Sequence, residues 1–126
     1  MEARAITKYV RVSPFKAREI TRNIQGKPVE AALALVDVSP RKAARLVGKT
    51  LRSAVSNAEN DERATNVSAG DLVVKEAVIG EGPTMRRFRP KARGMVGRIR
   101  KRTSHIRVVV SDEITPAKSR KRKSKR

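Results

Sequence analysis

The stretch from Thr84 to Arg102 reads TMRRFRPKARGMVGRIRKR and holds nine Lys or Arg, no acidic residue, one Phe, one Pro and two Gly. Apolar, β-forming runs flank it on both sides, at 72–79 (LVVKEAVI) and 103–110 (TSHIRVVV). Two such runs around a polar segment predict a β-hairpin. The segment far exceeds a two-residue turn, and connections of this length in compact domains are usually functional or disordered. The sequence therefore predicts an extended hairpin over residues 72–110 that carries a cationic loop.

The charge of the chain is placed unevenly. In total the 126 residues have a formal net charge of +19. Residues 1–83 carry fourteen bases and ten acids, whereas residues 84–126 carry seventeen bases and two acids. A field of this size attracts polyanions. At this length one modest core is expected, so we predict a single RNA-binding domain over 1–112 and a basic tail over 113–126.

Several classes of function are disfavoured by the composition. The chain has no Cys and one His, and its acids are scattered, so neither a metal site, a cofactor site nor a catalytic centre is expected. No Walker or dinucleotide loop suggests a small-molecule substrate. No apolar run approaches the roughly 18 residues that cross a bilayer, and the N-terminus lacks the apolar core of a signal peptide. We expect a soluble intracellular chain with no membrane partner.

The first seventy residues predict one strand and three helices. Alternation over 2–12 predicts a strand with Ile6, Val10 and Val12 on one face. Ser13-Pro14 begins a helix that Gly26 ends, and a short helix follows over about 28–36. Ser39-Pro40 is predicted to begin the longest helix, to about Asn60, because its apolar residues follow the i, i+3, i+4 spacing. With the hairpin, the fold class is α+β: three helices on a small three-stranded antiparallel sheet.

The longest helix has a basic face. It comprises Arg41, Arg45, Lys49 and Arg52. A solvated surface is the plain interpretation, but no acid lies between Pro40 and Ser56 to form the i, i+4 pairs that usually accompany one. Contact with phosphates is therefore favoured.

The residue types in the hairpin favour folded RNA. Arg outnumbers Lys there, and guanidinium can both bond phosphate bidentately and stack on bases. The chain has only three aromatic residues, which disfavours a stacking platform of the RRM type. Phe88 either stacks on RNA or packs to keep the tip compact. His105 is expected to be a structural or RNA-contacting residue rather than a catalyst.

The predicted RNA contacts form three sets. In the hairpin they are Arg86, Arg87, Phe88, Arg89, Lys91, Arg93, Arg98, Arg100, Lys101, Arg102 and His105; on the helix face Arg41, Arg45, Lys49 and Arg52; elsewhere Arg11, Lys16 and Arg18. The tail from Pro116 to Arg126 has seven bases in eleven residues and no large apolar side chain, so disorder is expected. A nuclear localisation signal and an RNA-clamping tail share this composition.

Three segments resemble the large-subunit ribosomal protein family numbered twenty-two. The run RIRKRTSHIRVVV at 98–110 is the most specific, and SPRKAARLV at 39–47 and AVSNAEN at 54–60 are similar to further family segments. The resemblance covers about residues 3–112. The absence of a large insertion resembles bacterial or organellar members.

The resemblance implies a structural constituent of the large ribosomal subunit that binds ribosomal RNA and aids assembly. It implies that the hairpin passes through RNA so that its tip, about Met85 to Met95, lines the nascent-polypeptide tunnel. Expected partners are large-subunit ribosomal RNA, neighbouring large-subunit proteins and the nascent chain. The expected location is the ribosome in the cytoplasm, or in an organellar stroma or matrix. The family assigns nothing to the tail.

Other classes of function remain open from the residues alone. A nucleoid-type or regulatory basic DNA-binding protein should bind plain duplex DNA as tightly as structured RNA. A nuclear import cargo or regulator would depend on its tail. An RNA-modifying enzyme would show turnover, although few residues of catalytic type are present.

Overall fold

The computed structural model describes residues 1–61 and 67–112. Its elements, in chain order, are β1 (Glu2–Val10), α1 (Pro14–Ile24), α2 (Val29–Val38), α3 (Lys42–Glu59), a 3-10 turn η1 (Ala69–Asp71), β2 (Val73–Glu81), β3 (Met85–Pro90), a 3-10 turn η2 (Ala92–Gly94), β4 (Val96–Lys101) and β5 (Ser104–Ser111). The α+β class is confirmed. The predicted tail falls outside the described residues.

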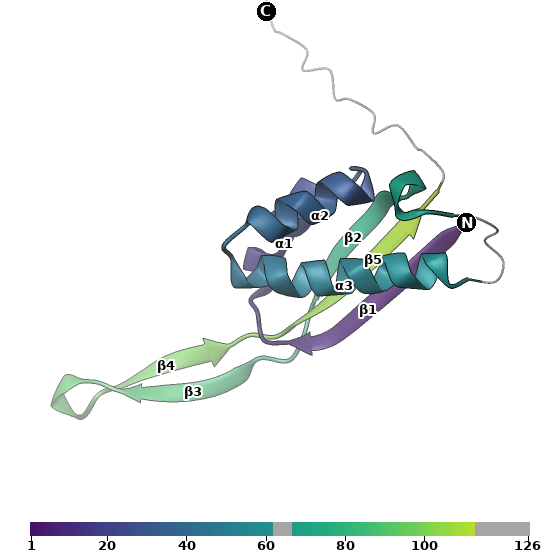
Figure 1. Cartoon of the computed structure of the whole chain (residues 1–126). Helices are drawn as coiled ribbons and strands as arrows, with labels where there is room; N and C mark the ends of the chain where they lie inside the picture. Colours follow the sequence, from purple (N-terminus) through teal and green to yellow (C-terminus); the bar gives the residue numbers. More distant parts are fainter. Residues whose placement is uncertain (62–66, 113–126) are drawn as a thin grey trace, which may run out of the picture.

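Three strands form an antiparallel sheet in the order β1-β5-β2, and the three helices cover one of its faces (Figure 1). The central strand β5 alternates as a half-buried strand should: Ile106, Val108 and Val110 are fully buried, whereas Arg107 between them is exposed. The helices contribute further buried side chains from their inner faces, among them Ile24 and Leu51. The core of the domain lies between this sheet face and the helices.

The helix boundaries mostly follow the predicted signals. Pro14 is the first residue of α1, and Gly26 after its end has φ 79° and donates its amide to the carbonyl of Val74. The predicted start of the longest helix was wrong by two residues. Ser39 is the C-cap of α2, and Arg41, rather than Ser39, is the N-cap of α3. The short link between α2 and α3 uses Ser39 to end one helix, so it cannot also begin the next.

The predicted faces of β1 were only partly right. Ala3 and Ala5 face the core while Ile6 is about half exposed, yet Val10 is buried. The alternation changes phase because the register with β5 shifts between Thr7 and Val10, and Tyr9 has φ 56°. A bulge of this kind adds a residue to one strand and turns the following side chain to the other face.

The basic segment is not a loop. Residues 85–101 fold as a second antiparallel sheet of two strands, β3 and β4, which project away from the rest of the domain (Figure 1). We call residues 82–103 the hairpin extension and the other described residues the body. At about 3.3 Å per residue, six-residue strands reach roughly 20 Å before the tip turn. The prediction of one long loop was wrong because a positive charge does not prevent strand pairing.

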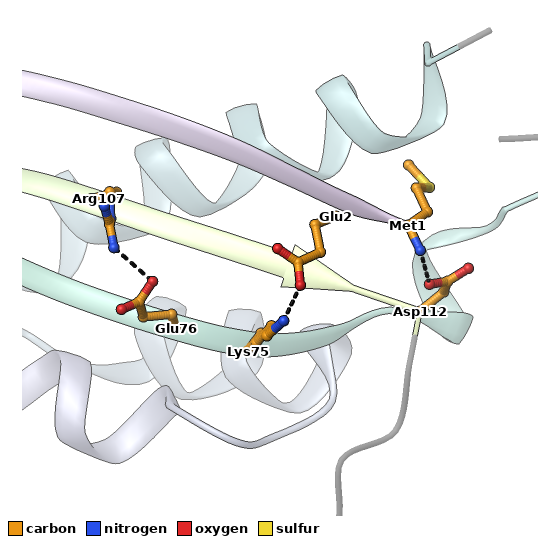
Figure 2. Close-up of polar contacts among 6 residues, drawn as sticks. All are labelled: Met1, Glu2, Lys75, Glu76, Arg107 and Asp112. Atoms are coloured by element: carbon orange, nitrogen blue, oxygen red, sulfur yellow. Dashed lines mark hydrogen bonds and ion pairs between the residues drawn. The ribbon is translucent and has the colours of Figure 1, made fainter. Parts of the chain in front are cut away.

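Cross-strand ion pairs cover the sheet face that the helices leave open. Arg107 of β5 lies 2.7 Å from Glu76 of β2, and Lys75 of β2 pairs with Glu2 of β1. At the end of the sheet, the terminal amine of Met1 lies 2.8 Å from the Asp112 carboxylate. Figure 2 shows these three pairs. Each pair joins residues distant in sequence, so acids and bases compensate one another across this face.

Candidate nucleic-acid interface

Cations line both faces of the hairpin extension. In an antiparallel ribbon, directly paired residues project to the same side. Arg86 pairs with Arg100 and Phe88 with Arg98, which puts this set on one face. Arg87 pairs with Ile99, and the other face includes Arg89, Met85 and Lys101. A ribbon with bases on both sides suits surroundings that are anionic on both sides, rather than a single flat surface.

The bases of the hairpin extension have no acidic residue near them in the sequence. No Asp or Glu occurs from Gly82 to Ser111. Among the described residues, no ion pair involves any of the nine bases between Thr84 and Arg102. Arg86 lies directly across from Arg100, an arrangement of like charges that destabilises a β ladder. An external polyanion would remove this repulsion.

The tip is a tight turn that exposes a strained arginine. The amide of Lys91 donates to the carbonyl of Met95 at 2.7 Å, which closes residues 91–95. Arg93 and Gly94 both have positive φ, at 60° and 70°. A left-handed backbone is ordinary for Gly but costs a residue with a side chain roughly 1–2 kcal/mol. Glycine would serve the turn better, so Arg93 is expected to be present for what its side chain contacts.

Phe88 does not pack against the chain. Its side chain is 71% exposed, on the same ribbon face as Arg86 and Arg98. The structure therefore gives no support to the interpretation that Phe88 keeps the tip compact. An exposed aromatic ring between guanidinium groups is suited to stacking on an unpaired base.

A short neck joins the hairpin extension to the body. The hydroxyl of Thr103 donates to the carbonyl of Pro83 at 2.6 Å, and the amide of Gly82 donates to the carbonyl of Thr103 at 3.0 Å. A Cβ at Gly82 would lie 2.4 Å from the Thr103 hydroxyl, so only Gly fits there. Sequence reasoning missed Thr103, although it lies within the most specific resembling segment.

Two of the residues predicted to contact RNA, Arg18 and His105, make hydrogen bonds within the body. Arg18 is about one-third exposed; its guanidinium donates to the carbonyl of Ile79 at 3.3 Å and lies 3.9 Å from the Glu81 carboxylate. The Nδ1 atom of His105 accepts the amide of Tyr9 at 3.0 Å, and the two rings meet edge to face. Both residues hold strand ends near the neck.

The basic face of α3 is partly compensated. Arg41 pairs with Glu19 of α1 and Arg52 with Asp37 of α2. The sequence correctly showed no acid between Pro40 and Ser56 to pair with these bases, yet two of the four have acidic partners from outside that stretch. The partners come from other helices, which the spacing within α3 could not reveal. Arg45 and Lys49 are exposed, and no ion pair involves them in the described part of the chain.

Arg11 and Lys16 lie in a cleft that the sequence did not predict. The cleft, of about 570 Å³, separates the start of α1 from the start of α3 and is lined by Arg11, Val12, Ser13, Lys16, Glu19, Arg41, Lys42 and Ala43. Arg11 also directs its guanidinium to the sulfur of Met85, at 3.6 Å, at the base of the hairpin extension. Lys42 was missed because it belongs to the basic set only through contact between distant segments.

Other kinds of site find little support in residues 1–61 and 67–112. This part of the chain holds no group of three or more His, Asp or Glu side chains placed to bind a metal ion. None of its helices is both long and apolar enough to cross a membrane.

Comparison with known proteins identifies the family to which this sequence is similar. The family model described as ribosomal protein L22p/L17e matches residues 5–111. Proteins named large ribosomal subunit protein uL22 are similar: that of Halothermothrix orenii is 50% identical over 113 residues, covering 90% of this chain and 97% of the relative. Those of Methylacidiphilum infernorum and Chloroflexus aggregans are 50% and 47% identical over 113 residues, covering 90% of this chain and 96% and 97% of the relatives. The chain belongs to the ribosomal protein L22p/L17e family.

Proposed function

We propose that this protein is a structural constituent of the large ribosomal subunit, that it binds ribosomal RNA, and that it aids assembly of the subunit. Residues 1–112 act as one RNA-binding domain. Large-subunit ribosomal RNA and neighbouring large-subunit proteins are its partners, and its place is the ribosome in the cytoplasm. The family membership and the names of the bacterial relatives support this function.

One observation carries the proposal: the bases of the hairpin extension lie on both of its faces and have no ion-pair partner among the described residues. Crowded RNA segments repel one another through their phosphates. Arginines between such segments replace counterions and let them approach, so binding should weaken steeply as salt rises. The exposed bases of α3 and of the α1–α3 cleft extend the same surface onto the body.

The tip is proposed to reach the nascent-polypeptide tunnel, with residues 85–95 nearest RNA or the passing chain. Supporting this, the turn at 91–95 is exposed, and two apolar side chains beside it, Met95 and Val96, are 69% and 58% exposed. Exposed apolar side chains at the end of a cationic ribbon can contact a peptide while the bases contact RNA. The protein acts as a scaffold rather than as an enzyme, with no cofactor and no small-molecule substrate.

The test is a charge-matched pair of variants. Replacing Arg86, Arg87, Arg89 and Arg93 with Ala should leave the body folded, because none of these side chains contributes to its core. In a sucrose gradient of cell lysate at high salt, wild-type protein should sediment with the large subunit, and the variant should slow assembly or wash off. The control replaces Arg4, Lys8, Lys27 and Lys75, which removes the same charge from the body. Equal behaviour of the two variants would contradict the role of the hairpin.

A further inference from the structure

Helix α2 differs from the rest of the chain because it has no base. The stretch from Pro28 to Pro40 is the longest in the sequence without Lys or Arg, although 31 of the 126 residues are Lys or Arg. Of the 10 residues of α2, all are apolar except the two acids Glu30 and Asp37. The neighbouring helices α1 and α3 carry bases on their exposed sides. This helix is therefore built for different surroundings from theirs.

The outward side of α2 is apolar as well as its inward side. Three apolar residues are buried against the core: Val29, Ala32 and Val36. Four more are exposed, and we call them the α2 stripe: Ala31, Ala34, Leu35 and Val38. Their i, i+3, i+4, i+7 spacing places them on one side of the helix. Val38 is 83% exposed and Leu35 is 43% exposed. A helix that is apolar all round is normally buried, and an exposed apolar patch bordered by polar groups marks a contact with another molecule.

Carboxylates border the α2 stripe. Glu30 and Asp37 are seven positions apart, so they lie on the same side of the helix beside the stripe. The Glu30 carboxylate lies near the 3-10 turn η1, because a Cβ at Gly70 would stand 3.4 Å from its Oε1 atom, and the next residue of η1, Asp71, is also exposed. Asp37 pairs with Arg52 of α3 but keeps 57% exposure. The surface therefore joins apolar side chains to acids.

This combination discriminates between classes of partner. Carboxylates repel phosphates, and apolar side chains offer phosphates no hydrogen bond, so RNA is a poor match. A second copy of the chain would bring the same acids to the interface from both sides and would join two chains of net charge +19. A different protein that presents apolar side chains bordered by Lys or Arg complements both the stripe and its acids.

We propose that the α2 stripe, together with Glu30 and Asp37, is the docking surface for a neighbouring protein of the large subunit that presents apolar side chains bordered by Lys or Arg. This inference rests on the proposed function and assigns the contact with a protein partner to one surface. Helix α2 lies apart from the hairpin extension (Figure 1), so the chain contacts RNA and this protein through separate regions.

The first test measures whether the stripe is covered in the large subunit. The sequence has no Cys, so a single introduced thiol can be labelled selectively. Val38→Cys replaces a residue of the stripe, and Met95→Cys is the matched control at the tip, where the exposed fraction is 69%. Substitution of such exposed side chains should leave the fold intact. Both thiols should react with N-ethylmaleimide in the free protein, and the thiol of Val38→Cys should lose its reactivity in isolated large subunits.

The second test identifies what covers each position. Benzophenone maleimide is attached to the same two thiols, the labelled chains are assembled into large subunits without a nascent chain, and light joins the benzophenone to whatever lies beside it. The product of Val38→Cys should resist ribonuclease, and mass spectrometry should map it to an apolar segment next to Lys or Arg in another large-subunit protein. The product of Met95→Cys should contain RNA.

The outcomes separate this inference from the proposed function. A Val38→Cys thiol that reacts as fast in the subunit as in the free protein overturns the docking surface alone. So does a product that joins this position to RNA, to a second copy of the chain or to an acidic segment. Absence of the wild-type chain from large subunits would reject the proposed function and the docking surface together.

Discussion

The body and the hairpin extension of one chain differ in whether their bases have acidic partners. In the body, Arg18, Arg41, Arg52, Lys75 and Arg107 each have an acidic partner, four of them more than forty per cent exposed. In the hairpin extension, nine bases have no such partner among the described residues, and two of them face each other directly. The body has the core and the ion pairs of an independently stable domain. The hairpin extension has a geometry that an RNA partner would complete.

The largest expected effect is a difference in the free energy of unfolding between replacing an apolar residue of the body and replacing one of the hairpin extension. Leu51 is fully buried, so Leu51→Ala should lower the free energy of unfolding by about 2–5 kcal/mol. Phe88→Ala should change it by less than about 0.5 kcal/mol because the ring is exposed, yet it should weaken RNA binding by about 1–3 kcal/mol if the ring stacks on a base. Urea denaturation and RNA titration of both variants measure this. A large loss of stability in Phe88→Ala would mean that the hairpin extension has a core of its own.

Substitutions at two glycines test whether the body is packed more tightly than the hairpin extension. A Cβ at Gly48 of α3 would lie 2.5 Å from a methyl group of Val36 in α2, within the body. Gly48→Ala should therefore cost about 1–3 kcal/mol by overpacking, partly offset by the better helix propensity of Ala. A Cβ at Gly97 would also meet an atom at 2.5 Å, but that atom is the flexible end of Lys91. Thermal unfolding should show a clear drop for Gly48→Ala and almost none for Gly97→Ala.

Replacing Arg86, which lies across from Arg100 in the hairpin extension, should have a smaller effect of opposite sign on the free energy of unfolding. Arg86→Ala removes the repulsion with Arg100 and should leave the free energy of unfolding unchanged or raise it by about 0.2–1 kcal/mol. The same change should weaken RNA binding and reduce its salt dependence. Denaturation at low salt together with an RNA titration checks both signs. A destabilised variant would show that Arg86 supports the fold rather than only the partner.

The smallest effect is expected from an ion pair of the body. Arg107 and Glu76 lie 2.7 Å apart on the open sheet face, both about half exposed (Figure 2). A double-mutant cycle with Ala at both positions should give a coupling of about 0.2–1 kcal/mol at low salt. The coupling should fall toward zero near 1 M salt, where the Debye length is only about 3 Å. A coupling that persists at high salt would indicate a hydrogen bond sheltered from solvent.

Local signals were enough for most of the fold. Pro14 and Gly26 marked α1, the i, i+3, i+4 spacing marked α3, and alternation marked β5, because each depends on neighbours within a few residues. The basic residues of the candidate nucleic-acid interface could also be predicted from local sequence. The nine bases of residues 84–102 indicated a polyanionic partner, and the sequence of residues 98–110 indicated the family.

What failed depended on contacts between distant segments. The register shift near Tyr9 is set by pairing with β5. Ser39 is the C-cap of α2, and α3 begins two residues later than predicted, with Arg41 as its N-cap.

The sequence by itself determined the helices, the three strands of the larger sheet, the excess of bases and their concentration in one segment, because composition and periodicity are local properties. Only the tertiary structure decided that this segment is a two-faced ribbon, that Glu19 and Asp37 reach bases of α3, and that Arg11, Lys16, Arg41 and Lys42 share a cleft. Charges act through distance in space, and folding sets that distance for residues far apart in the chain, such as Arg52 and Asp37 at 15 positions and Lys42 and Arg11 at 31 positions.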